Sequence, residues 1–139
     1  MMKKKQKVEL EQRKQLQSDG WDVNLEQSIK SNDGFVNETE LHLIAKIFAA
    51  KHLSSLGYRI NTEVTHEDGH AEIDLIAYGH AQRLTYAVEI ETNPDDDVLE
   101  SKREKYLTES VDDMLVIDCR GMPMNMIDAQ RYIQDELNV

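Results

Sequence analysis

The chain contains a single cysteine, Cys119, in 139 residues. One cysteine cannot form an intramolecular disulfide or supply the set of thiolates of a cysteine-based zinc site, which fits a reducing compartment. The apolar runs are far shorter than the roughly 18 residues that span a bilayer. The basic start at residues 1–7 is not followed by the apolar segment of a signal peptide. We therefore expect a cytoplasmic protein with no membrane partner.

Basic residues are also scarce, because 16 Lys and Arg face 27 Asp and Glu, for a formal net charge of -11. Phosphate binding normally requires an excess of positive charge, so this balance argues against a passive nucleic-acid coat. Residues 1–20 differ from the rest, with six basic and three acidic side chains. This basic segment is either a local approach to DNA or a solvated extension.

Several motifs of known chemistry are missing. The sequence has no G-x-x-x-x-G-K, G-x-G-x-x-G or G-x-S-x-G, so nucleotide hydrolysis, dinucleotide chemistry and nucleophile-elbow hydrolysis are not supported. It also lacks H-E-x-x-H, so the five histidines are expected to be ordinary surface residues.

Hydrophobic periodicity predicts one compact domain over residues 35–139 after an N-terminal extension and linker at residues 1–34. In the extension, residues 3–17 are helix-compatible but too polar to bury firmly, and residues 23–30 form a weak helix. The domain is predicted to contain a helix at 37–56, strands at 58–66, 72–78 and 84–92, a helix at 96–109, a strand at 114–118 and a helix at 126–137. This order predicts an α/β fold with a mixed four-stranded sheet flanked by helices.

The helix predicted at 37–56 has the clearest pattern, with Asn37 as its N-cap and an apolar stripe whose main members are Leu41, Ile44, Phe48 and Leu53. Glu40 shares that stripe, which is an unusual place for a charge without a function. Asn37 and Glu40 also fit a capping box, in which Glu40 would be structural. Both interpretations of Glu40 stay open.

Four carboxylates alternate along the second and third predicted strands, Glu72 and Asp74 on one and Glu89 and Glu91 on the other. Because side chains alternate faces along a strand, each pair shares a face. A connecting loop of two or four residues would set Asp74 opposite Ala87 and Glu72 opposite Glu89, with all four carboxylates on one face. A loop of three or five residues would separate the pairs.

The opposite face of this hairpin favours the same pairing, because it would then be continuously apolar, with Ile73, Leu75, Ala77, Tyr86, Val88 and Ile90. Like charges placed side by side destabilise a sheet, and a hard divalent cation with oxygen ligands removes that conflict. The alternative is a solvated acidic face on an edge hairpin, which discourages aggregation.

The order of elements, with Asp74 on the second strand and Glu89-Ile90-Glu91 on the third, resembles the PD-(D/E)XK or restriction-endonuclease-like superfamily. The resemblance extends from about residue 35 to the C-terminus and implies an αβββαβα core. It also implies that Asp74 and Glu89 bind Mg²⁺ or Mn²⁺. An acid from the first helix often joins them in that superfamily, and Glu40 is the closest match, with Glu38 second.

Glu91 stands where the superfamily motif carries a lysine. A carboxylate at this position could accept a proton from the attacking water or bind a further metal ion. Alternatively, the following helix could supply the cation through Lys102, which shares a helical stripe with Leu99 and Tyr106, or through the nearby Lys105. Ordinary solvated charge is the competing interpretation of both lysines.

The resemblance therefore implies a metal-dependent nuclease that hydrolyses DNA, with Glu91, Lys102 and Lys105 as candidate catalytic residues. The candidate metal ligands are Asp74, Glu89, Glu91 and Glu40. A non-catalytic DNA- or protein-binding module that retains the fold without the motif lysine is the alternative. Since the chain has no room for a separate target-recognition domain, we expect a homodimer or a partner protein to supply specificity.

Overall fold

The structure is a computed structural model, and it describes residues 3–26, 28–31, 38–82 and 84–139. Its elements confirm the predicted α/β fold and its αβββαβα order after an N-terminal helix. In chain order they are α1 (Lys4–Ser18), α2 (Glu40–Ser55), β1 (Arg59–Thr65), β2 (Glu72–Tyr78), β3 (Tyr86–Glu91), α3 (Asp96–Tyr106), β4 (Asp113–Asp118), the 3₁₀ turn η1 (Cys119–Gly121) and α4 (Met126–Leu137).

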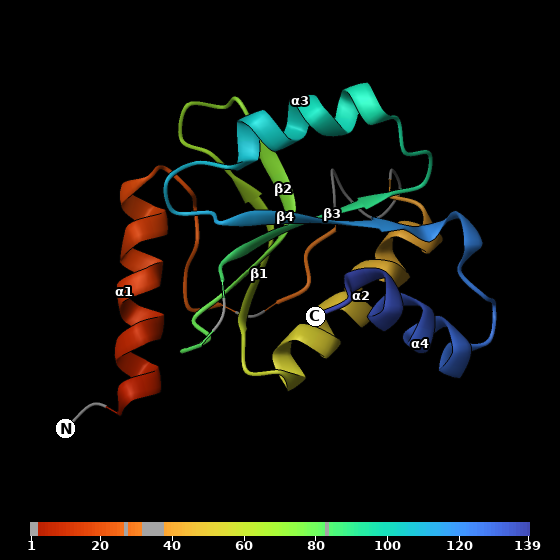
Figure 1. Cartoon of the computed structure of the whole chain (residues 1–139), viewed down its shortest axis with the longest axis horizontal. Helices are drawn as coiled ribbons and strands as arrows, with labels where there is room; N and C mark the ends of the chain where they lie inside the picture. The colour runs from red at the N-terminus through yellow and green to blue at the C-terminus, as the bar shows by residue number, and fades with distance from the viewer. Residues whose placement is uncertain (1–2, 27, 32–37, 83) are drawn as a thin grey trace.

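The four strands form one mixed sheet in the order β1-β2-β3-β4. The β1–β2 and β2–β3 pairs are antiparallel, and β3 pairs with β4 in parallel. A parallel pair needs a crossover connection, and α3 provides it. In Figure 1, α3 lies on one side of the sheet, α2 and α4 lie on the other, and α1 stands beside the sheet.

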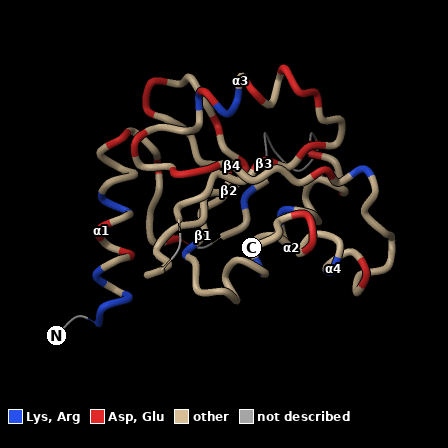
Figure 2. Tube along the Cα trace, in the orientation of Figure 1, with Lys and Arg blue, Asp and Glu red and all other residues tan. Residues whose placement is uncertain are grey.

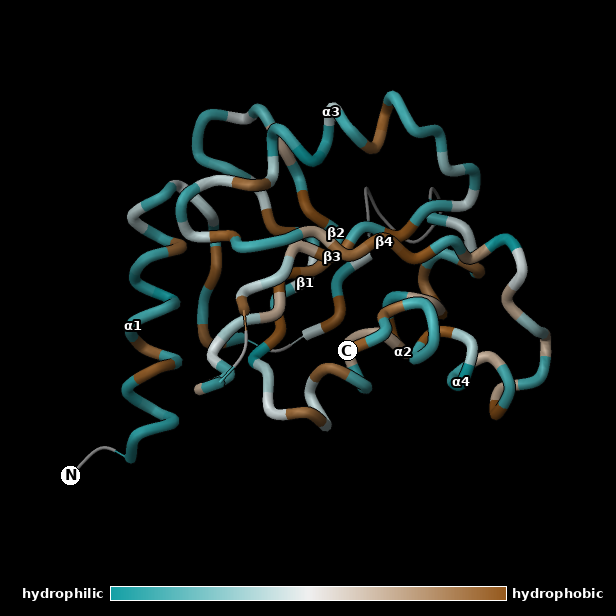
Figure 3. The backbone as a smooth tube through the Cα atoms, viewed as in Figure 1, coloured by the Kyte–Doolittle hydropathy of each residue, from teal (hydrophilic) through white to brown (hydrophobic). Residues whose placement is uncertain are grey.

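Two clusters of buried side chains hold these layers together. The first joins α2 and α4 to one face of the sheet through residues such as Leu53, Leu75 and Ile133. The second joins the opposite face to the N-terminal segment and to the end of α3, with Trp21 and Tyr106 among its members. Figure 3 shows the apolar strands in the centre, between the largely polar tubes of α1 and α3. None of the described helices is long and apolar enough to cross a membrane.

The start and the buried face of α2 differ from the prediction. Its N-cap is Thr39, whose side chain accepts a hydrogen bond from the His42 amide, whereas Asn37 lies outside the described residues. The predicted stripe is partly wrong, because the Ile44 side chain is 41% exposed and the small Ala45 is fully buried. Alanine brings the helix backbone close to the sheet, so the buried face is rotated toward the small residues.

The β2–β3 register is shifted by two residues from the predicted one. Leu75 pairs with Val88 and Ile76 with Ala87, so the pairing of Asp74 with Ala87 is wrong, and the next position along the ladder sets Asp74 opposite Glu89. A shift of two residues preserves the alternation of faces. The register alone would keep the hairpin carboxylates on one face, but Asp74 contacts His42 of α2 whereas Glu89 contacts Lys102 of α3.

The apolar face predicted for this hairpin is confirmed only in part. Leu75, Ala77 and Val88 pack in the first cluster as predicted. Ile73 packs instead in the second cluster, with Val64, its partner on β1. The change of side coincides with Glu63, which precedes Val64 and has a positive φ of 49°. The regular alternation of β1 is therefore interrupted next to Ile73.

The N-terminal segment is part of the same folded body and not a solvated extension. Leu16 and Trp21 are 0% and 1% exposed, and the Trp21 indole N–H donates to Thr108 Oγ1 at 2.9 Å. The Gln12 side chain accepts the Gly79 amide at 2.6 Å. The weak helix predicted at 23–30 is irregular chain in its described part. The polar composition of α1 suggested a solvated segment, but a few apolar residues are enough to pack it against the sheet.

This docking predicts that Leu16→Ala lowers the free energy of unfolding by about 2–5 kcal/mol, as expected for removing a buried leucine side chain. Leu25, which is 66% exposed, provides the matched control, and Leu25→Ala should change the same free energy by less than about 0.5 kcal/mol. Urea unfolding followed by circular dichroism measures both values. Equal small losses in the two variants would mean that the segment does not pack on the sheet.

Candidate active site

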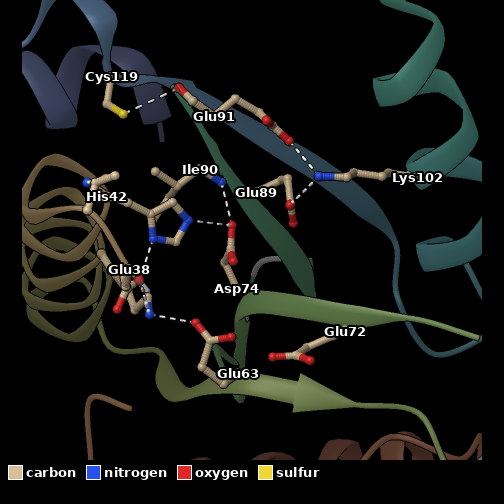
Figure 4. A network of polar contacts seen from close by, with 12 residues as sticks. Glu38, His42, Glu63, Glu72, Asp74, Glu89, Ile90, Glu91, Lys102 and Cys119 are labelled. Carbon is tan, nitrogen blue, oxygen red and sulfur yellow. Dashed lines mark hydrogen bonds and ion pairs between the residues drawn. The ribbon is translucent and has the colours of Figure 1, made fainter. Parts of the chain in front are cut away.

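Lys102 of α3 lies between the two glutamates of β3. Its ammonium donates to Glu89 Oε1 at 2.8 Å and to Glu91 Oε1 at 2.6 Å. Glu89 and Glu91 are two residues apart on one strand, so both side chains project toward the helix that covers this face. The crossover helix thus places one cation between two carboxylates that would otherwise repel each other, as Figure 4 shows.

Asp74 of β2 joins the sheet to α2. One of its oxygens accepts the Ile90 amide at 2.8 Å and lies 3.4 Å from His42 Nε2. The other ring nitrogen of His42 contacts the Glu38 carboxylate. His42 therefore bridges two acids from opposite sides of its ring, in the line Glu38–His42–Asp74 of Figure 4.

A further cation, Lys46, lies next to Glu38 at one end of this network. Lys46 of α2 is fully buried, and its ammonium lies 2.5 Å from Glu63 Oε1 and 2.7 Å from Glu38 Oε2. It also donates to the Lys30 carbonyl at 2.8 Å, so three oxygens surround the buried ammonium. A buried ammonium is tolerated only with such partners.

Glu63 reaches Lys46 through an unusual backbone conformation. Its φ of 49° is left-handed, which is uncommon for a residue with a side chain. The regular β1–β2 pairs lie on either side of it, Thr62 with Leu75 and Val64 with Ile73. Local distortions of this kind redirect side chains and concentrate at functional sites.

Burial is the main cause of the raised pKa of Glu89. Burial and the neighbouring charge of Asp74 raise the pKa of Glu89 to about 8, although Lys102 opposes the shift. Burial and a hydrogen bond that protonated Glu63 donates to Glu72 likewise raise the pKa of Glu63 to about 8, against the effect of Lys46. Two carboxyl groups of this network therefore take up protons near neutral pH.

The pKa values of the two cationic partners, His42 and Lys102, are raised as well. Burial alone would lower the pKa of His42, but its contacts with Asp74 and Glu38 outweigh burial and raise it to about 9. The pKa of Lys102 is also raised, since its contacts with Glu89 and Glu91 outweigh its partial burial. At neutral pH both residues carry a positive charge next to the acids.

Two carboxylate oxygens of this network, Glu63 Oε2 and Glu89 Oε2, are buried without a hydrogen-bond partner among the described residues. Glu89 Oε2 is buried and makes no hydrogen bond within the described residues, while the whole Glu89 side chain is 6% exposed. Leaving a buried carboxylate oxygen unpaired is costly. Glu89 lies close enough to Asp74 for the charge of Asp74 to raise its pKa, so a cation bound by these two acids would satisfy the Glu89 oxygen. The donor set fits Mg²⁺ or Mn²⁺, because both prefer carboxylate oxygens and Mg²⁺ needs only one or two from the protein.

The predicted site residues divide into two groups. Asp74, Glu89, Glu91 and Lys102 are brought together. Glu40 is the first residue of α2 and is exposed, and it is not the third helical residue that the capping box requires. Lys105 is exposed on α3, where its carbonyl accepts a hydrogen bond from His70.

The sequence did not predict three members of this network, His42, Lys46 and Glu63. Glu38, the second choice for the helix acid, contacts His42 and Lys46. One sequence feature could have indicated that Lys46 is buried. It lies between Ala45 and Ala49, and small apolar neighbours are typical of a buried helix face. Glu63 offers no such signal, because the bend that turns it inward has no local sequence motif.

Comparison with known proteins gives no relative to set beside this geometry. No protein-family model matches the chain, and neither a curated protein nor a solved structure matches it.

The raised pKa values predict how stability depends on pH in the absence of divalent cations. Glu89 (about 8, usually 4.5) and His42 (about 9, usually 6.5) bind protons more tightly in the folded state. The free energy of unfolding should therefore fall as pH rises from about 6 to about 9. Glu89→Gln should make this slope shallower, as measured by urea unfolding at several pH values. Glu104→Gln, on the exposed side of α3, should keep the parent slope, and an unchanged slope in Glu89→Gln would contradict the assignment.

Proposed function

We propose that this protein is a divalent-metal-dependent nuclease that hydrolyses DNA phosphodiester bonds, built on the restriction-endonuclease-like fold that its sequence resembles. The observation that carries the proposal is the unpartnered, buried Glu89 oxygen beside Asp74, with Lys102 on its other side. An acidic face kept only for solubility would be exposed and solvated, whereas Asp74 and Glu89 are each 5% exposed.

Asp74 and Glu89 would hold a Mg²⁺ or Mn²⁺ ion. When bound, the ion would lower the pKa of a coordinated water and neutralise charge on the scissile phosphate. His42 and the Ile90 amide fix the orientation of the Asp74 carboxylate, which leaves its remaining lone pairs for a ligand.

Lys102 is the residue best placed to do the work of the missing motif lysine. It reaches back from α3 to both β3 glutamates, and the raised pKa keeps it charged. A charged ammonium cannot act as a base, but it can orient water and stabilise the negative charge that develops on a phosphate. Glu91 then anchors Lys102, which makes a role as the general base the weaker assignment for Glu91.

A non-catalytic module with the same fold is the second candidate, and one contact favours it. Lys102 already neutralises Glu89 and Glu91 without any metal ion. Without a metal ion, Lys102 would still offset the negative charge of Glu89 and Glu91. The fold would then be stable as a non-catalytic DNA- or protein-binding module.

Two lysines of α3 provide a matched pair for testing catalysis. Lys102→Met should lower the rate of Mg²⁺- or Mn²⁺-dependent DNA cleavage by on the order of 10²-fold or more, because it removes a preorganised charge at the phosphate. Lys105→Met removes the same charge at an exposed position of the same helix and should cleave like the parent. Cleavage is measured on single-stranded, duplex and branched DNA. Equal activity of the two variants would remove Lys102 from the site.

The metal ligands predict a separate pair of effects. Mg²⁺ should raise the melting temperature of the parent through binding to the folded state, and more strongly at pH 8.5 than at pH 6, because the ligand Glu89 must lose its proton. Asp74→Asn and Glu89→Gln should abolish both this gain and cleavage while the variants remain folded. A parent that neither cleaves nor gains melting temperature with any of these metals would favour the non-catalytic module.

A further inference from the structure

A second group of metal-ligating side chains surrounds the turn between β1 and β2. His66, Asp68 and His70 each direct one donor atom to a common point, and these three atoms lie within 4.8 Å of one another. His66 Nδ1 is 2.9 Å from Asp68 Oδ1, and His70 Nδ1 contacts the same oxygen. Within the described ranges no other three side chains meet this spacing, and the Asp74 site does not meet it either.

The outer nitrogens of both histidines are held by backbone carbonyls. His66 Nε2 lies 2.7 Å from the Asp19 carbonyl oxygen, and His70 Nε2 lies 3.2 Å from the Lys105 carbonyl oxygen. A carbonyl can only accept, so each Nε2 carries a hydrogen, and in the neutral form of each ring the lone pair of Nδ1 faces inward. The Asp68 amide donates to His66 Nδ1 at 3.3 Å, in agreement with that tautomer.

With both rings neutral, this arrangement brings electron-rich atoms toward one another around Asp68 Oδ1. Two imidazole lone pairs and a carboxylate oxygen repel unless a proton or a metal ion lies between them. Histidines that bind metals typically donate their other N–H to a carbonyl or carboxylate, which fixes the ring. Both histidines of this turn have that support from chain segments far away in the sequence.

We propose that His66, Asp68 and His70 bind one divalent transition-metal ion, with Zn²⁺ as the representative, and that solvent completes its coordination. Two imidazole nitrogens and one carboxylate oxygen suit Zn²⁺, Co²⁺, Ni²⁺ or Cu²⁺ better than Mg²⁺, which prefers oxygen ligands alone. The site is thus chemically distinct from the Asp74–Glu89 pair.

The ion would act as a clamp between three parts of the chain. The turn is tied to the end of α1 by the Asp19 carbonyl and by the Glu67 amide, which donates to the Gly20 carbonyl at 2.8 Å. It is tied to α3 by the Lys105 carbonyl. The Trp21 ring packs against both histidine rings, with centroids 4.8 and 6.0 Å away. Fixing this end of α3 also fixes the helix that carries Lys102.

Zn²⁺ titration of purified, metal-free protein tests the site, with binding measured by calorimetry and stability by thermal unfolding. The parent should bind one Zn²⁺ per chain and gain melting temperature. Asp68→Asn and His70→Gln should weaken Zn²⁺ binding by at least about 10-fold and lose the gain, because each removes a ligand from an exposed or half-exposed position. Circular dichroism before titration verifies that both variants are folded.

Two further variants locate the ion. His80→Gln replaces a histidine outside the cluster, and Glu89→Gln alters the candidate active site, so both should bind Zn²⁺ like the parent. Absence of Zn²⁺ binding in the parent, or parent-like affinity in Asp68→Asn and His70→Gln, would overturn the proposal. Loss of binding in Glu89→Gln alone would do the same, since it would assign the ion to the other site.

Discussion

The charge balance of the acids that lie inward along β1, β2 and β3 is the constraint on which the rest of the structure depends. Glu63 and Glu89 lie near Asp74 across three strands, where burial and the charge of Asp74 both disfavour ionisation of the two glutamates. Each of the three acids is adjacent to a cation from a helix, since Lys46 reaches Glu63, His42 reaches Asp74 and Lys102 reaches Glu89. Removing one cation would leave a buried acid unpaired, which costs more than the ion pair gains.

This balance explains the position of both covering helices. Helix α2 supplies two cations at one turn's spacing, His42 and Lys46, and its small buried residues let it approach the sheet closely. Helix α3 returns the chain from β3 to β4 and carries Lys102 over the face that β3 presents. In Figure 2 acidic segments concentrate around α3, while basic segments mark α1, so the net negative charge lies around this site and not at the N-terminus. Within the network, Glu89 keeps one oxygen that no described residue satisfies.

Sequence reasoning recovers what repeats along the chain. Strand and helix periods give the order of elements, and even the alternation of the acidic hairpin survives a two-residue error in its register, because faces repeat every two residues. The length of a loop does not follow from its composition, so the register itself was wrong. Lys46 resembles a solvated helix charge until its partner Glu63 is known, and Glu63 depends on a backbone bend created by tertiary packing. Glu40 and Glu38 could be told apart only once Thr39 was found to be the N-cap of α2.

The position of a bound hard divalent cation decides whether Asp74 and Glu89 form a metal site. Crystals grown with saturating Mn²⁺ and measured at wavelengths where manganese scatters anomalously would locate the ion directly. If Asp74 and Glu89 form the metal site, one anomalous peak should lie within bonding distance of both carboxylates, and the Lys102 ammonium should still contact Glu91. A map with no peak at these acids, in which Lys102 remains bound to both Glu89 and Glu91, would contradict this assignment.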